Sequence, residues 1–72
     1  ASPGKSPHEK LSDREFQILC LIASGKSLKD IGTTLSISGK TVSSYRTRIM
    51  EKMNMKTNAD LVGYALQNKI IE

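Results

Sequence analysis

The 72-residue sequence predicts an all-α domain of four short helices, and two observations support that prediction. A hydroxyl residue followed three positions later by an acidic one, the signal of a capping box at a helix start, occurs at Ser12, Ser27 and Thr57. Apolar residues then recur at intervals of three and four, as Ile31 and Leu35 do, which gives each predicted helix an apolar face. A chain of this length forms one domain with a small core.

The first predicted helix covers about Asp13–Ser24 and has the strongest start signal. Ser12 and Glu15 have the spacing at which each side chain bonds the backbone N–H of the other. The apolar residues within Ile18–Ala23 cover more than half of the circumference of the helix. We therefore expect this helix to lie at the centre of the core.

The next two predicted helices form a helix-turn-helix. The first covers about Leu28–Leu35, and the second begins after Ser38 and ends near Met53. The short segment between them can only turn, and Ile37 is placed to fill the corner. Gly32 has no side chain and so lets the second helix approach the first closely.

The third predicted helix has two faces that differ in character. The side chains expected to face the core are Val42, Tyr45, Arg46, Ile49 and Met53. The side chains expected on the exposed face are Lys40, Ser43, Ser44, Thr47, Arg48 and Glu51. The exposed face is thus made of small, polar and charged residues.

Positive charge is concentrated on this same segment. Between Ser38 and Lys56 there are five basic residues and one acidic residue, which accounts for the net charge of +4, whereas basic and acidic residues cancel in the rest of the chain. Such a local excess is the electrostatic footprint expected for nucleic-acid phosphates. The chain has only one Phe and two Tyr, too few for the stacking surfaces that bind single strands, so the predicted partner is double-stranded DNA.

Other classes of function find no support in the sequence. It contains no catalytic set of residues, metal-ligand spacing or Gly-rich phosphate loop, so we expect no enzyme, no cofactor and no metal. Cys20 is the only cysteine and excludes an internal disulfide. No apolar run of membrane-spanning length and no leader are present, which predicts a cytoplasmic protein without a membrane partner. Residues 1–10 lack apolar periodicity and are interpreted as a flexible linker or cloning remnant before a domain at residues 11–72.

The fourth predicted helix runs from Thr57 to about Asn68 and has more apolar surface than a small core can bury. Its apolar stripe includes Leu61 and Ala65. We expect part of the helix to pair two protomers, and the residues predicted for dimerisation are Val62, Tyr64, Leu66 and Gln67.

A known sequence pattern is spread over three of the predicted helices and two turns. Its residues are Leu11, Ser12, Arg14, Glu15, Leu21, Ile22, Ala23, Gly25, Ser27, Ile31, Leu35, Ile37, Ser38, Thr41 and Val42. On these residues the chain from Leu11 to Leu66 resembles the LuxR-type, or NarL/FixJ-type, output domain of bacterial response regulators. The resemblance implies a four-helix domain whose third helix enters the major groove and whose fourth helix forms a homodimer on DNA. It also implies an upstream receiver domain in the full-length protein.

The sequence departs from this family pattern at four positions. Gly32 stands where alanine is usual, and Ser43 stands where many members have lysine. Arg46 replaces a branched apolar residue, and Asn58 replaces an arginine that often contacts a phosphate. The base preference of relatives is therefore not transferred to this chain.

The predicted DNA contacts fall into two groups. Short side chains on the third helix let its backbone lie deep in the groove, and the residues predicted to contact bases are Lys40, Ser43, Ser44 and Thr47. Basic residues and the N-termini of helices favour phosphate, and the residues predicted to contact phosphates are Ser27, Lys29, Thr41, Tyr45, Arg46, Arg48, Lys56, Thr57 and Asn58. Lys40 is also a candidate for phosphate contact.

The predicted function is sequence-specific DNA binding by the C-terminal output domain of a bacterial transcriptional regulator, of the two-component response-regulator type. One alternative is promoter recognition by a domain like region four of a sigma factor, although the helical segment after Met55 argues against it. The other is a module that no longer binds DNA and only dimerises or docks on RNA polymerase, against which the charge of +4 argues. RNA polymerase also remains open as a partner of a DNA-bound dimer.

Overall fold

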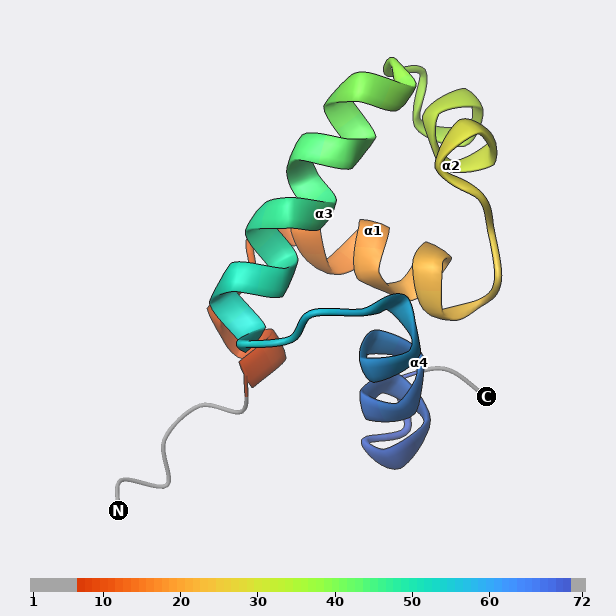
Figure 1. Ribbon diagram of the computed structural model, residues 1–72. Helices are drawn as coiled ribbons and strands as arrows, with labels where there is room; N and C mark the ends of the chain where they lie inside the picture. Colours follow the sequence, from red (N-terminus) through yellow and green to blue (C-terminus); the bar gives the residue numbers. More distant parts are fainter. Residues whose placement is uncertain (1–6, 71–72) are drawn as a thin grey trace.

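The computed structural model describes residues 7–70, which contain four α-helices and one short 3-10 helix and no strand (Figure 1). The elements are η1 (Pro7–Lys10), α1 (Asp13–Ala23), α2 (Leu28–Leu35), α3 (Gly39–Met53) and α4 (Asn58–Gln67). The predicted all-α fold is confirmed, and the predicted helix ends agree with these to within a residue. The predicted linker and domain include residues 1–6 and 71–72, which lie outside the described residues, while Pro7–Lys10 lies against α3.

Each α-helix begins at a hydroxyl residue whose side chain accepts the backbone N–H three positions later. These N-cap residues are Ser12, Ser27, Ser38 and Thr57. Only α1 has the complete capping box, in which the Glu15 carboxylate also accepts from Ser12 N–H at 2.8 Å. The prediction of a reciprocal bond at the start of α2 and α4 is wrong, because aspartate is one methylene shorter than glutamate. In α4 the Asp60 carboxylate accepts from Lys56 N–H at 3.3 Å, and not from the N–H of the N-cap Thr57.

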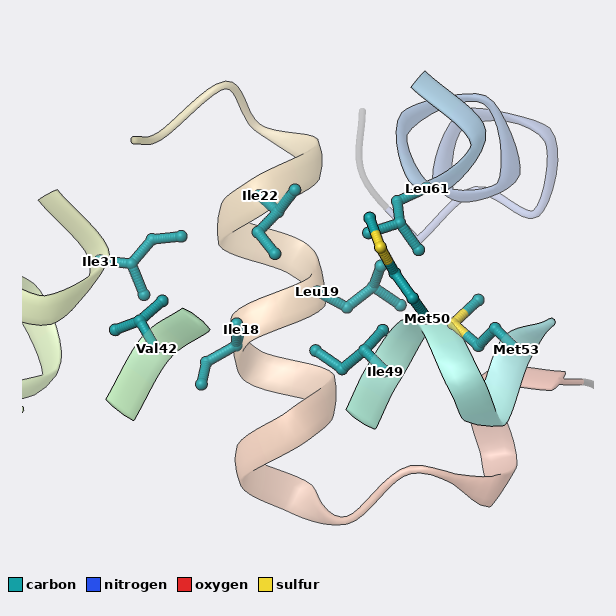
Figure 2. Close-up of a cluster of buried hydrophobic side chains, with 9 residues drawn as sticks. All are labelled: Ile18, Leu19, Ile22, Ile31, Val42, Ile49, Met50, Met53 and Leu61. Atoms are coloured by element: carbon teal, nitrogen blue, oxygen red, sulfur yellow. The ribbon is translucent and has the colours of Figure 1, made fainter. Parts of the chain in front are cut away.

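The core is built around α1, which contacts α2, α3 and α4. In Figure 2 the α1 side chains lie between two groups, with Ile31 and Val42 on one side and Leu61 and the end of α3 on the other. The core side chains are Ile18, Leu19, Ile22, Ile31, Val42, Ile49, Met50, Met53 and Leu61. The position predicted for the first helix at the centre of the core is therefore confirmed.

Met50 is a core residue that the apolar periodicity of the sequence did not predict. Its exposed fraction is 9%, and Figure 2 shows it beside Leu61 of α4. The C-terminal half of α3 packs where α1 and α4 meet, so it buries a wider face than the single stripe expected from periodicity.

Glu15 is the one polar or charged residue that is buried in the described part of the chain, with an exposed fraction of 3%. Its carboxylate accepts from Lys52 Nζ at 2.7 Å and from the N–H of Ser12. Burial alone raises the pKa of this carboxyl, but the hydrogen bonds from Lys52 and Ser12 and the charge of Lys52 outweigh it, and the pKa lies below its ordinary value. The pair joins the start of α1 to the last turn of α3.

The turn between α2 and α3 depends on close contact at Gly32. A Cβ atom placed there would lie 2.7 Å from the carbonyl oxygen of Ile37, a backbone atom. Ile37 N–H donates to the carbonyl of Gly32 at 2.9 Å, and Ser36 ends α2 in the left-handed conformation with φ of 59°. The predicted close approach at Gly32 is confirmed.

We expect Gly32→Val to lower the free energy of unfolding by about 1 to 3 kcal/mol, because the new side chain must displace the backbone of the turn. Gly63→Val is the matched control, since nothing lies within 4 Å of a Cβ on Gly63 and valine forms helix slightly better than glycine. Urea unfolding of both variants measures the effect. Equal stability of the two variants would show that the turn yields freely at Gly32.

We expect Glu15→Gln to lower the free energy of unfolding near pH 7 by about 1 to 3 kcal/mol, because the negative charge that strengthens the partly buried hydrogen bond from Lys52 is lost. The folded protein lowers the pKa of Glu15, so its stabilisation is present above the ordinary value of 4.5 and is lost as the pH falls through the lowered pKa. The stability curves of wild type and variant should therefore converge in acid. Thermal melts from pH 7 to pH 3 measure this, with the exposed Glu51→Gln as control, and a constant gap between the curves would contradict it.

Candidate nucleic-acid interface

The outer face of α3 is a continuous polar surface. The side chains predicted to contact bases are all exposed there, namely Lys40, Ser43, Ser44 and Thr47. Val42 and Ile49 lie on the opposite side of the same helix and are fully buried. Burial of the inner side thus fixes which side of α3 is presented to a ligand, and we call the exposed side, Lys40 to Glu51, the α3 arc.

The hydroxyl groups at this face differ in their partners. Thr47 Oγ1 donates to the carbonyl of Ser43 at 3.1 Å. Thr41 Oγ1 lies 2.9 Å from the hydroxyl of Ser38, the N-cap of α3, so Thr41 also belongs to the capping of this helix. Within the described residues the hydroxyls of Ser43 and Ser44 have no hydrogen-bond partner.

Tyr45 and Arg48 form one edge of the α3 arc. Tyr45 is half-buried and packs against the core, and the guanidinium of Arg48 lies over its ring, 5.9 Å from the centroid. This cation–π contact limits the positions available to Arg48. The two residues are three apart on one helix, a spacing that could have indicated the contact from sequence.

Arg46 connects α3 to the start of α4. Its Nε donates to Oδ1 of Asn58, the first residue of α4, at 2.7 Å. Lys56 and the N-cap Thr57 are exposed next to Asn58. Four predicted phosphate contacts from two helices are therefore brought together at a helix N-terminus, where backbone N–H groups favour anions. No spacing in the sequence indicates this pair, because its members lie in different helices.

Two more predicted phosphate contacts lie on α2. Ser27 and Lys29 are exposed at its start, where the Ser27 hydroxyl accepts from Asp30 N–H at 3.1 Å. In the part of the chain that the structure describes, no hydrogen bond or ion pair joins them to the α3 arc. Ser27 and Lys29 therefore form a separate candidate phosphate site.

One basic residue of the charged segment is already occupied. Lys52 forms the ion pair with Glu15, which leaves Lys40, Arg46, Arg48 and Lys56 without an acidic partner among the described residues. The positive surface is therefore smaller than the sequence count of five suggested.

The outer face of α4 is different in character. Leu66 is the one large apolar side chain that is exposed in the described residues, with an exposed fraction of 54%, and Gln67 beside it is also exposed. Val62 and Tyr64 are half-buried, and Tyr64 packs against the core. Of the four residues predicted for dimerisation, two thus lie fully on the surface and two contribute only their outer parts.

A shallow groove of about 490 Å³ runs between the end of α3 and α4. Its lining residues are Asn54, Met55, Ala59, Asp60, Gly63, Tyr64 and Gln67. Asp60 is the only charged residue among them, so the groove does not belong to the basic surface and lies beside the predicted dimerisation residues.

No second kind of site is evident in residues 7–70. They contain no group of three His, Cys, Asp or Glu residues that could hold a metal ion. Burial raises the pKa of Cys20, which disfavours the reactive thiolate. None of the described helices is long and apolar enough to cross a membrane.

Comparison with known proteins gives a consistent result. Residues 9–65 match the family described as bacterial regulatory proteins, luxR family. The chain is 46% identical over 71 residues to the oxygen regulatory protein NreC of Staphylococcus epidermidis, covering 99% of this chain and 33% of that protein. It is 43% identical over 65 residues to the transcriptional regulatory protein LiaR of Bacillus subtilis, covering 90% of this chain and 31% of that protein. The chain thus spans about a third of the length of these relatives.

Proposed function

The chain belongs to the luxR family of bacterial regulatory proteins, a family of DNA-binding transcription regulators rather than enzymes, and we propose that α3 of this domain reads a specific duplex sequence from the major groove. The α3 arc is the observation that supports this proposal. It is an exposed, polar helix face with basic residues and helix N-termini at its edges. An α-helix of this kind fits the width of the major groove of B-form DNA.

In this proposal the two kinds of contact come from different places. Ser43, Ser44 and Thr47 reach base edges, and Lys40 at the start of α3 reaches a base or the adjoining phosphate. Phosphates on one side are held by Arg46 and the start of α4, and on the other by Ser27, Lys29 and the start of α2. The sugar-phosphate backbone of the DNA beside α3 is contacted by Thr41, Tyr45 and Arg48. Phosphate contacts of this kind fix position without distinguishing sequences.

The orientation of Arg46 supports its role at a phosphate. The bond from Nε to Asn58 uses one donor and leaves the two terminal NH₂ groups of the guanidinium available. They lie beside the N-terminus of α4, so one phosphate can accept from Arg46 and from backbone N–H groups together. Asn58 then acts mainly by holding Arg46 in place.

We further propose that the domain acts as a homodimer through Val62, Tyr64, Leu66 and Gln67 of α4. The exposed position of Leu66, next to the shallow groove, supports this face. Because the chain covers about a third of its relatives, the full-length protein would carry a receiver domain before residues 11–72, as in two-component response regulators. Such a regulator works on cytoplasmic DNA, with RNA polymerase as a further partner. Family membership removes the support for the sigma-factor alternative.

The salt dependence of binding tests the phosphate contacts. Five basic residues of each protomer are proposed to lie at phosphates, namely Lys29 on α2 and the four of the α3–α4 segment that remain after Lys52 is set aside, so a dimer should give a slope of log affinity against log salt of about −9. Arg48→Ala should weaken binding to specific and random duplexes alike and make the slope shallower by about 2. Mobility shifts over a salt series measure both, with Lys69→Ala as the control outside the patch.

Two outcomes would contradict this part of the proposal. A slope shallower than about −3 in wild type would reject the number of contacts. Absence of any duplex binding at low salt would favour the alternative of a module that only dimerises or docks on polymerase.

The dimer interface is tested by Leu66→Glu. A charge at the centre of the proposed interface should abolish the cooperative gain seen when two half-sites lie about one helical turn apart. Binding to a single half-site and the melting temperature should stay unchanged, because Leu66 is mainly exposed. Gln17→Glu, at an exposed position of α1, is the control for added charge, and unchanged cooperativity in Leu66→Glu would reject α4 as the interface.

A further inference from the structure

Thr47 lies in the middle of the α3 arc, one turn after Ser43 and Ser44. Its Oγ1 is 3.1 Å from the carbonyl oxygen of Ser43. A carbonyl oxygen can only accept a hydrogen bond, so the Thr47 hydroxyl is the donor. Its single hydrogen is therefore used by the backbone of its own helix.

This bond determines what Thr47 can offer to a ligand. The lone pairs of Oγ1 and the methyl group remain available on the exposed side, but no hydrogen does. The β-branched side chain has few alternative χ1 positions in a helix, and this bond selects one of them. Ser43 and Ser44 have no such bond within the described residues and remain able to donate or to accept.

The rest of the arc shows the same division along the helix. Lys40 near the N-terminal end carries only donors. Glu51, one turn after Thr47, carries only acceptors, and its carboxylate has no hydrogen bond or ion pair among the described residues. Arg48 does not neutralise it, because its guanidinium lies over Tyr45. Arg48 carries only donors but lies at the edge of the arc against Tyr45, so the middle of the arc changes from donors at Lys40 to acceptors at Thr47 and Glu51.

Resting on the proposed binding of α3 in the major groove, we propose that Thr47 determines specificity by accepting a hydrogen bond from an exocyclic amino group of a base. In that groove the amino groups are N6 of adenine and N4 of cytosine, whereas N7 of purines, O6 of guanine and O4 of thymine are acceptors. Thr47 has no hydrogen for these acceptors. They are left to Lys40 and the two serines.

The test deletes one hydrogen-bonding group at a time from the DNA and from the protein. A duplex is first selected from random sequences with the wild-type domain. In each half-site, purine then replaces adenine and pyrimidin-2-one replaces cytosine to delete an amino group, and 7-deaza bases delete the N7 acceptor. Binding of each duplex is measured with wild type and with Thr47→Val, which keeps the shape but not the oxygen.

At one position, deletion of the amino group should weaken wild-type binding by roughly 3- to 10-fold and leave Thr47→Val unaffected. Deletion of N7 should change both proteins equally. Thr47→Ser, which retains the hydroxyl, should be as sensitive to this deletion as wild type. Ser44→Ala is the matched comparison on the same arc: it lowers overall binding but should keep the wild-type sensitivity to deletion of this amino group. Equal melting temperatures show that the variants are folded.

Two results would overturn the inference while leaving the proposed function in place. In the first, Thr47→Val abolishes the effect of deleting N7, which would require the Thr47 hydroxyl to donate. In the second, every deletion weakens binding of wild type and of Thr47→Val equally. Failure of the wild-type domain to select any sequence would overturn the proposed function itself, and this inference with it.

Discussion

The packing of α1 against the other three α-helices is the interaction on which the rest of the domain depends. Ile18 and Leu19 are fully buried there, between the α2–α3 pair on one side and α4 on the other. A fully buried side chain of this size contributes about 1.5 to 3 kcal/mol, a large share of the net stability of so small a domain. Because α4 packs mainly on α1, whereas α2 also packs directly on α3, the α1 side chains chiefly determine where α4 lies relative to α3.

The position of α3 is further fixed by one contact near each end and one in its middle. At the N-terminal end the turn passes within van der Waals contact of Gly32. In the middle, Arg46 bonds Asn58 of α4, and in the last turn Lys52 bonds Glu15 of α1. These contacts lie on the inner side and edges of the helix, so they orient it without covering the exposed arc.

The two polar contacts of α3 differ in energetic character. Glu15 is buried, so loss of Lys52 leaves only the hydrogen bond from Ser12 N–H to offset the desolvation of its carboxylate. Arg46 and Asn58 are solvent-accessible, and a hydrogen bond in such a place contributes little to stability. The first pair is therefore expected to matter for folding. The second is expected to matter for where the Arg46 guanidinium meets a phosphate.

Local sequence determined the secondary structure of this protein and the side of α3 that faces outward. Hydroxyl N-caps bond within four residues, and apolar periodicity acts within one helix, so Ser38 and the pair Val42 and Ile49 were sufficient to predict α3 and its exposed arc. The close contact at Gly32 was also predictable, because the turn that requires it is adjacent in sequence.

Tertiary structure decided which polar residues meet, because such contacts join segments with no fixed spacing in the sequence. Sequence placed Glu15 only in a capping box and counted Lys52 with the DNA-binding charge, whereas folding brings them within 2.7 Å. It also brings Arg46 to Asn58 and adds Met50 to the core. The Thr47 bond is local, yet sequence alone does not determine whether this hydroxyl donates to the backbone or to a ligand. The choice depends on the rotamer that the side chain adopts in the folded helix.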